Sequence, residues 1–382
     1  MDDLSRHDAI ALGGLIRKGE ISPIELLDST IHQIEKVNPK LNAVIHKMYE
    51  QARNTAENWS VKLSKDQAMG AVFCGVPFLL KDLIAEYRGV PFSEGSQAVN
   101  GYNSQLDSEL VKRQKAAGLI IVGKTNTPEF GCLPITDSVL LGPTLNPWNP
   151  NLTPGGSSGG SAAAVVAGIV PMAHGNDGGG SIRIPASCCG LFGLKPTRGR
   201  NPLGPLFGDL GGGIVSEHAL TRTVRDSAAL LDVTSGADIG DPYYAPPKGR
   251  PFLEEVKRDA GSLKIGFLTS VPEGWSLKIQ VHPDCLDAVK DAARLCEDLG
   301  HIVEEIVPNQ FSDPNILQNY GHIWSCLIGH IIAYWERELG RKIEQDEIEP
   351  LNWEDYQAGL KISGADYLVT LEEIQRFSRK IA

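Results

Sequence analysis

The stretch TPGGSSGGSAAAVVAG, from Thr153 to Gly168, decides the fold and raises the functional question. Four glycines and three serines lie between Gly155 and Ser161, and small apolar residues follow at once. Glycine loses more conformational freedom on folding than any other residue, so such a run costs stability. A glycine loop that leads into a helix presents backbone N–H groups, which attract an anion or a developing negative charge. The stretch therefore predicts a loop-to-helix junction with a chemical role.

A second glycine-rich stretch, GNDGGGSIRIP, occupies residues 175–185. Acyl transfer needs a nucleophile, a base, and N–H donors at the position where the oxyanion forms. Ser181 is a candidate nucleophile, because it follows three glycines whose N–H groups can face an incoming carbonyl. These glycines are Gly178, Gly179 and Gly180.

A candidate base lies upstream, in the apolar run GVPFLLKDL at residues 75–83. The run is typical of a buried strand, and burial at its end would allow Lys81 to lose its proton near neutral pH. Asp82 would point to the opposite face of an extended segment and need not keep the lysine charged. The chain contains no S-x-x-K motif, so Lys81 and its nucleophile must meet through the fold, with Ser157 as the obvious intermediary.

Composition narrows the class of protein. A chain of 382 residues can bury a large core, and its net charge of -11 argues against nucleic acid as a partner. Seven cysteines, an odd number without C-x-x-C spacing, indicate reduced thiols in a cytoplasm rather than disulfides or a zinc site. No apolar run reaches the roughly 18 residues of a membrane span, and the first residues do not resemble a signal peptide. We expect a cytoplasmic protein without a membrane partner.

The order of apolar and polar segments predicts an α/β fold. Residues 1–70 are predicted as helices, one of which starts at the capping box Ser22-Pro23-Ile24-Glu25. Residues 71–235 hold both glycine-serine stretches, with a second buried strand at 119–122, and residues 236–262 form a Pro/Gly-rich connection.

Residues 263–382 open with a strand–helix–strand pattern. The strands are predicted at 263–268 and 301–307, and the helix runs through DCLDAVKDAARLCEDL to a C-cap at Gly300. Alternation of strands and helices favours α/β architecture. We expect one domain over residues 1–382.

The glycine-serine stretch has two alternative interpretations. A phosphate-binding P-loop needs G-x-x-x-x-G-K-[ST], which does not occur. The pattern G-x-S-x-G does occur at Gly155–Gly159, and would make Ser157 or Ser158 the nucleophile of a Ser-His-Asp esterase. The histidines downstream that such an enzyme could use are His218, His282, His301, His322 and His330.

Together, GGSSGGSAAA, D-x-GGS-x-R-x-P, C-G-L-x-GLKPT-x-GR and the preceding G-V-P-x-L-L-K-D resemble the amidase signature family. The resemblance runs from about Ser22 to the end of the chain and is most specific between Gly75 and Arg198. It implies an α/β fold with a mixed central β-sheet flanked by helices. It also implies hydrolysis of a linear or cyclic carboxamide through a seryl acyl-enzyme, without a metal or other cofactor.

The resemblance assigns roles to residues that the motifs match. It implies a Ser–cis-Ser–Lys triad in which Ser181 is the nucleophile, Ser157 the bridging serine after a cis peptide, and Lys81 the base. The backbone N–H groups of Gly178, Gly179, Gly180 and Ser181 would form the oxyanion hole. Around them, supporting residues are expected at Ser158, Asp177 and Arg183.

Within the family, TNTPEFG, AHGND, IRIPAS and GRKIEQDEIEPLNWE are most similar to 6-aminohexanoate-cyclic-dimer hydrolases. Two positions expected to line the substrate pocket, Cys132 and Trp324, depart from that group's pattern. The glutamine-amidase subunit of a tRNA-dependent amidotransferase is an alternative, although FGDLGGGIVSEHALTRTVRD departs from its usual sequence.

The resemblance also bears on length and assembly. Family members normally continue past this point, so we expect the C-terminal part of the family fold to be missing. An inactive, truncated binding protein is therefore a further alternative. The expected partner is a small-molecule amide, and a homodimer is the assembly considered.

Overall fold

The computed structural model describes residues 6–65, 67, 70–271, 280–306 and 311–382. The chain forms two compact units. Unit 1 comprises Met1–Val256 and Ile331–Glu354, and unit 2 comprises Lys257–His330 and Asp355–Ala382. A compact unit is not by itself an independently folding domain, so the single domain over 1–382 stays a prediction.

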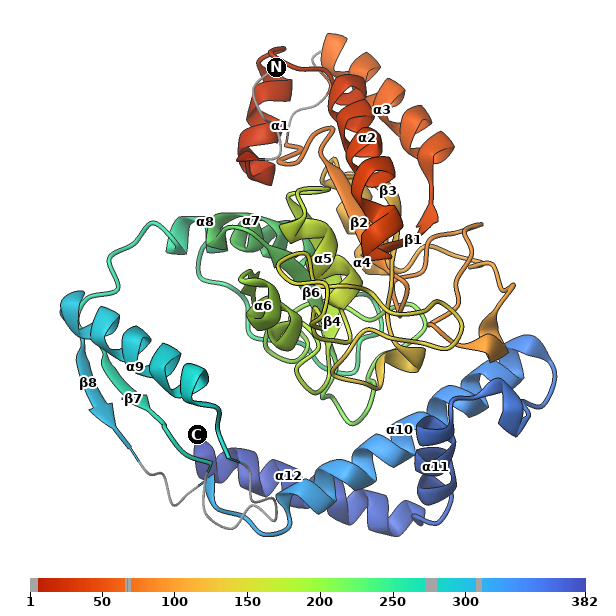
Figure 1. Ribbon diagram of the computed structural model, residues 1–382, viewed down its shortest axis with the longest axis vertical. Helices are drawn as coiled ribbons and strands as arrows, with labels where there is room; N and C mark the ends of the chain where they lie inside the picture. Colours follow the sequence, from red (N-terminus) through yellow and green to blue (C-terminus); the bar gives the residue numbers. More distant parts are fainter. Residues whose placement is uncertain (1–5, 66, 68–69, 272–279, 307–310) are drawn as a thin grey trace. The chain divides into compact units, whose positions relative to one another are not determined.

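Unit 1 is built on a six-stranded mixed sheet with the strand order β1-β3-β2-β4-β6-β5 (Figure 1). β2 pairs in parallel with β3 and β4, whereas β1, β5 and β6 are added in antiparallel pairs. The strands are β1 Val44–Lys47, β2 Pro77–Lys81, β3 Ile120–Thr125, β4 Met172–Asp177, β5 Phe192–Gly193 and β6 Ser216–Thr221. The predicted mixed sheet flanked by helices is confirmed.

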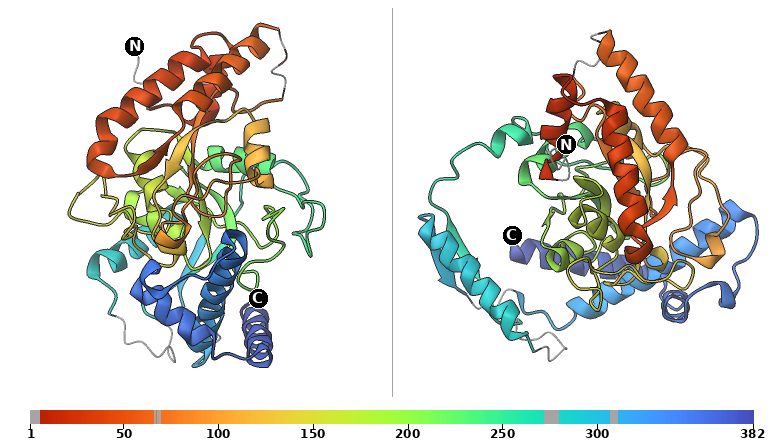
Figure 2. Two further views of the ribbon diagram at one scale, coloured as in Figure 1. Left: turned by 90° about the vertical axis from the view of Figure 1, so that its right-hand side faces the viewer. Right: turned by 45° about the horizontal axis from the view of Figure 1, so that its top comes forward.

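Helices of unit 1 pack directly on these strands (Figures 1 and 2). α2 packs on β2, α3 on β3, α5 on β4, and α7 on β6. The helices are α1 Ala9–Arg17, α2 Pro23–Leu41, α3 Tyr49–Ser64, α4 Glu109–Ala116, α5 Gly159–Val166, α6 Arg183–Cys189, α7 Val224–Thr234 and α8 Phe252–Glu255. Short 3-10 turns are η2 Gln97–Val99, η3 Glu129–Gly131 and η5 Gln345–Glu347.

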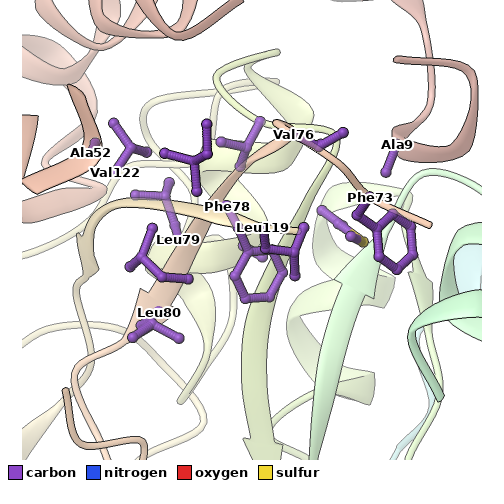
Figure 3. Close-up of a cluster of buried hydrophobic side chains, with 14 of the residues drawn as sticks. Ala9, Ala52, Phe73, Val76, Phe78, Leu79, Leu80, Leu119 and Val122 are labelled. Atoms are coloured by element: carbon purple, nitrogen blue, oxygen red, sulfur yellow. The ribbon is translucent and has the colours of Figure 1, made fainter. Parts of the chain in front are cut away.

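The central strands are buried along their whole length. Every residue of β2, β3, β4 and β6 is buried. Figure 3 shows Phe78, Leu79 and Leu80 of β2 in one buried cluster with Val122 of β3 and with Leu119, which precedes β3. Each fully buried side chain of this kind contributes roughly 1.5–3 kcal/mol relative to an exposed one. The core therefore fixes the position of β2, which ends at Lys81.

The local predictions for unit 1 hold with one correction. α2 has the predicted capping box between Ser22 and Glu25, with Pro23 in the first turn. Residues 1–70 are not entirely helical, because β1 (Val44–Lys47) adds an antiparallel strand to β3. A four-residue strand whose burial falls off toward its end leaves no clear periodicity in the sequence.

Unit 2 contains a separate two-stranded parallel sheet of β7 (Lys264–Phe267) and β8 (Ile302–Glu305). α9, Pro283–Asp298, connects them, and Gly300 follows it with φ +88. The predicted strand–helix–strand unit is thus confirmed, except that residue 307 lies outside the described residues.

The remaining helices contribute to unit 2 in part or in whole. They are α10 Ile316–Leu339, α11 Pro350–Gly359 and α12 Gly364–Ile381. α10 and α11 have residues in both units. Among the residues that the structure describes, no helix has the length and apolar character that crossing a membrane requires.

Candidate active site

Two strand ends bring the predicted residues together in unit 1. β2 and β4 are parallel neighbours, so Lys81 at the end of β2 and Asp177 at the end of β4 lie at the same edge of the sheet. Ligands of open α/β sheets bind at the carboxyl ends of parallel strands. Ser181 follows β4 in the turn before α6, and Ser157 precedes α5.

Lys81 is completely buried and directly contacts Ser157, the predicted bridging serine. Its Nζ lies 2.6 Å from Ser157 Oγ and 2.6 Å from Asn176 Oδ1. Asn176 Nδ2 donates to the carbonyl oxygen of Leu83, which orients the amide so that its oxygen faces the lysine. Burial lowers the pKa of Lys81 to about 7, although nearby acidic groups, Asp177 first among them, oppose the shift.

Asp82 takes no part in this contact. Its carboxylate forms an ion pair with the buried Lys124 and accepts a hydrogen bond from Ser93. Successive side chains of an extended segment point to opposite faces, which separates Asp82 from Lys81. Within the described part of the chain, the direct partners of the Lys81 amine are Ser157 and Asn176, and neither is a carboxylate.

The glycines around Ser157 let three backbone segments approach one another. The Gly156–Ser157 peptide bond is cis. A Cβ on Gly156 would lie 2.4 Å from the carbonyl oxygen of Ile135, and one on Gly160 would lie 2.5 Å from the backbone nitrogen of Asn126. Contacts this close essentially never occur for real Cβ atoms. Close approach, rather than flexibility, explains these glycines.

The backbone of Ser181 is hydrogen-bonded to that of Ser158, the residue after Ser157. Its carbonyl oxygen accepts a hydrogen bond from the Ser158 N–H at 3.1 Å, and its side chain is nearly buried. Gly180, one of the predicted oxyanion donors, has φ +127 and donates its N–H to Asp177 Oδ1 at 2.7 Å. In this conformation the Gly180 N–H is therefore already hydrogen-bonded to the Asp177 carboxylate within the turn after β4.

The predicted supporting residues organise the loop after β4. Arg183 forms a two-pronged ion pair with Asp177, at 2.9 and 2.8 Å. Burial opposes the charge of Asp177, but the Arg183 guanidinium and backbone N–H groups outweigh it and keep the pKa of this carboxyl below its usual range. Ser158 Oγ donates to the carbonyl oxygen of Asn176 at 3.2 Å.

The two predicted pocket residues lie in different units. Cys132 follows η3 in unit 1 and is half-buried, next to Gly131, where a Cβ would lie 3.1 Å from Ser157 Oγ. Trp324 belongs to α10 within unit 2, where its ring stacks on Tyr320. Their role in substrate binding stays a prediction.

Of the five histidines named for the esterase alternative, His218 lies in unit 1. His218 is buried beside Ser227 Oγ at 2.8 Å, and burial lowers the pKa of His218 to about 3. The other four candidates lie in unit 2. Ser157 Oγ contacts a lysine instead, which favours a serine–lysine arrangement over a serine–histidine one.

Three residues at this site were missed in the sequence. Asn176 contacts Lys81 Nζ, His174 Nδ1 accepts the Lys81 backbone N–H at 3.3 Å, and Glu217 Oε1 lies 3.1 Å from His174 Nε2. For His174 and Asn176 the available signal was MAHGND, in which polar side chains alternate along a strand that is buried throughout, and for Glu217 it was the equally buried SEHALT. A polar side chain in such a strand must find a partner inside the protein.

Comparisons with known proteins show to which family the chain is similar. The family model described as Amidase matches residues 25–352. A 6-aminohexanoate-cyclic-dimer hydrolase of Paenarthrobacter ureafaciens is 40% identical over 98% of this chain and 74% of the relative. A putative amidase of Synechocystis sp. is 36% identical over 100% of this chain and 71% of its own length.

Solved structures give the same result. A 6-aminohexanoate cyclic dimer hydrolase complexed with substrate superposes with a TM-score of 0.92 at 38% identity, covering 99% of this chain and 76% of the other. A bacterial aryl acylamidase of the amidase signature family gives a TM-score of 0.87 at 30% identity, covering 98% and 76%.

Proposed function

The chain belongs to the amidase family, and from this premise we propose that it hydrolyses its substrate through a covalent ester on Ser181. It is an amidase, a hydrolase of C–N bonds other than peptide bonds. In this reaction we assign Lys81 as the base, Ser157 as the relay, and Ser181 as the nucleophile.

We propose that each of these groups has one role in acylation. Neutral Lys81 Nζ accepts the proton of Ser157 Oγ, and Ser157 in turn accepts the proton of Ser181 as its Oγ attacks the amide carbon. The carbonyl oxygen becomes an oxyanion, for which we propose the N–H groups of Gly178, Gly179 and Ser181 as donors. When the C–N bond breaks, the proton returns through Ser157 to the leaving amine.

Deacylation uses the same groups in the same order. A water molecule gives its proton through Ser157 to Lys81 and attacks the ester carbon of the acyl-enzyme. The bond between the acyl carbon and Ser181 Oγ then breaks, and Ser181 recovers a proton by way of Ser157. The net reaction consumes one water and yields a carboxylic acid and an amine.

One observation carries this proposal: the 2.6 Å contact between the buried Lys81 Nζ and Ser157 Oγ. A lysine whose pKa is lowered to about 7 by burial is neutral in a large fraction of molecules at neutral pH, which a general base requires. An esterase with a histidine base would need an imidazole in this position.

We propose linear and cyclic carboxamides as the substrate class. The relative from Paenarthrobacter ureafaciens is named for the cyclic dimer of 6-aminohexanoate, so that dimer is the first substrate to test. Glutamine hydrolysis for a tRNA-dependent amidotransferase and binding without catalysis are the competing functions. Appearance of a primary amine from the cyclic dimer or from a linear amide, and release of ammonia from glutamine, measured side by side, separate them.

The decisive experiment maps the reactive serine with a fluorophosphonate, followed by peptide mass spectrometry. We expect the label on Ser181. A label on Ser158 that is lost on replacement of His218 would instead support an esterase, and absence of any label would support the inactive binding protein. Ser181→Ala is the matched control.

The cellular compartment and the oligomeric state of the enzyme are also open to proposals. The chain has seven cysteines, an odd number without C-x-x-C spacing, and on that ground we propose a reducing compartment, the cytoplasm. The homodimer stays a prediction, which light scattering of the purified chain tests directly.

A further inference from the structure

Two side chains of β4 hold Lys81 at its two ends. His174 Nδ1 accepts the backbone N–H of Lys81 at 3.3 Å, and Asn176 Oδ1 accepts from Nζ at 2.6 Å. The two residues are two positions apart, so they lie on the same face of the strand. Both are buried, as is the entire lysine. The direction of the lysine is thus fixed from backbone to amine.

Glu217 continues this arrangement on the next strand. It is paired with Asn176 in the antiparallel register of β4 and β6, which places both side chains on one face. Glu217 Oε1 lies 3.1 Å from His174 Nε2, and the carboxyl group is buried. Because Nδ1 of His174 accepts from Lys81, the proton of the neutral ring is on Nε2 and is donated to Glu217.

Several charged or titratable groups face Lys81 from the elements around it. They are His174 and Asp177 on β4, Glu217 on β6, and Cys132 and Glu94 in loops. Asp177 is already paired with Arg183, and Glu94 accepts a hydrogen bond from Trp335 Nε1. Glu217 has a histidine as its partner, so its negative charge acts on Lys81 through a poorly screened interior.

Building on the proposed role of Lys81 as base, we propose that Asn176, His174 and Glu217 are positioning residues for it. Asn176 Oδ1 accepts a hydrogen bond from one N–H of the amine, so that the lone pair of the neutral form faces Ser157. The His174–Glu217 pair holds the backbone at Lys81, and the Glu217 carboxylate sets the pH at which the amine gives up its proton.

This proposal differs from a purely structural role in what it predicts about pH. A buried polar group that only stabilises the fold changes the amount of folded enzyme, and leaves the midpoint of its pH profile unchanged. A negative charge near the amine favours the protonated form, so its removal lets the amine lose its proton at lower pH. The midpoint of the pH profile is therefore the diagnostic quantity.

Glu217→Gln is the central variant, because it keeps the shape and an acceptor for His174 while removing the charge. We expect the midpoint of Ser181 labelling by the fluorophosphonate to move down by about one pH unit. The labelling rate at pH 6 is expressed as a fraction of the plateau rate of the same protein. This fraction should be about five times larger in Glu217→Gln than in the wild type. Asn176→Asp adds a charge beside Nζ and should move the midpoint up by about one pH unit.

Glu86→Gln is the matched control. Glu86 is a buried carboxylate of unit 1 outside the set that faces Lys81, so its removal should leave the midpoint at the wild-type value. Because Glu217→Gln and Asn176→Asp shift the midpoint in opposite directions, either variant alone can test the proposal if the other does not fold.

A second readout does not depend on activity. The ¹³Cε signal of Lys81, assigned by its loss in Lys81→Met, reports the protonation of the amine directly. Opposite shifts of this midpoint in Glu217→Gln and Asn176→Asp support the inference, and an unchanged midpoint in both overturns it. If the signal shifts while the labelling profile does not, the inference stands and the role of Lys81 as base is wrong.

Discussion

The backbone N–H of Ser158 donates a hydrogen bond to the carbonyl oxygen of Ser181 at 3.1 Å. Ser158 belongs to the turn that enters α5, and Ser181 to the turn between β4 and α6. The bond joins the two glycine-serine stretches through their backbones, in addition to the hydrogen bond from Ser158 Oγ to the carbonyl oxygen of Asn176. The side chains of Ser157 and Ser181 are thereby left free for chemistry.

This relationship makes Ser157 testable without disturbing the loops. In Ser157→Ala the Ser158–Ser181 bond and the backbone donors remain, while the proton path from Ser181 to Lys81 is interrupted. We expect turnover to fall by about 10²- to 10⁴-fold, the usual contribution of general acid–base catalysis. Slow labelling of Ser181 by the fluorophosphonate should persist. Wild-type turnover in this variant would contradict the relay.

Gly160 tests whether close approach explains the glycines. A Cβ there would lie within 3 Å of backbone atoms of Asn126 and Ala43, which cannot move aside as a side chain can. We expect Gly160→Ala to lower the free energy of unfolding by about 1–3 kcal/mol.

A matched control is Gly14→Ala in α1. Gly14 has nothing within 4 Å of its ideal Cβ, and alanine in a helix gains up to about 1 kcal/mol over glycine. Urea unfolding of both variants gives the comparison. Equal stabilities would mean that the backbone packed around Gly160 at the start of α5 relaxes easily.

Asp177→Asn tests the support of the nucleophile loop. The carboxylate accepts from the Gly180 and Ile182 N–H groups and from the Arg183 guanidinium. Removing its charge weakens these bonds and leaves Arg183 without its ion pair, so we expect a loss of about 1–3 kcal/mol in the free energy of unfolding. The labelling rate of Ser181 should fall as well. An unchanged rate would show that Asp177 stabilises the fold without shaping the site.

The sequence predicted the three central residues because their motifs are local. Each of Lys81, Ser157 and Ser181 lies within a short run whose glycines or apolar residues mark its environment. Asn176, His174 and Glu217 carry no such mark, because their roles depend on which strands are neighbours. The β4–β6 register brings Glu217 opposite Asn176, a relation across 41 positions that periodicity does not contain.

The same limit applies to the fold. β2 and β3 were predictable from continuous apolar runs, which strands buried on both faces require. β1 was missed, because four residues that become progressively more exposed fit a helix end as well as a strand. Likewise, the engagement of the Gly180 N–H by Asp177 depends on the turn geometry after β4, which the run of glycines leaves undetermined.

Lys81→Arg tests the base directly. Burial lowers the pKa of Lys81 to about 7, so activity should rise with pH through that value and stay high above it. Arginine cannot deprotonate in proteins, so Lys81→Arg keeps the charge and should fail to acylate across pH 6–9. Circular dichroism confirms folding. Acylation near the wild-type rate would mean that lysine is not the base.

Lys81→Met tests the same pKa through stability. The folded pKa of Lys81 is about 7, whereas an unfolded lysine has one near 10.4, so between these values the unfolded chain binds one more proton at this site. The free energy of unfolding of the wild type therefore increases with pH between these two pKa values, by about 1.4 kcal/mol per pH unit. At pH values below both, the full cost of burying the amine opposes folding.

The variant lacks this titration, because methionine carries no proton to release. The free energy of unfolding of the wild type minus that of Lys81→Met should accordingly be flat below pH 6. It should then grow by about 2–3 kcal/mol between about pH 7.5 and about pH 9.5. Urea unfolding of both chains at each pH measures the difference, in which the titration of other groups cancels. A difference that stays flat up to pH 9.5 would show that Lys81 keeps an ordinary pKa and enters the folded state charged, which a resting base on Ser157 cannot do.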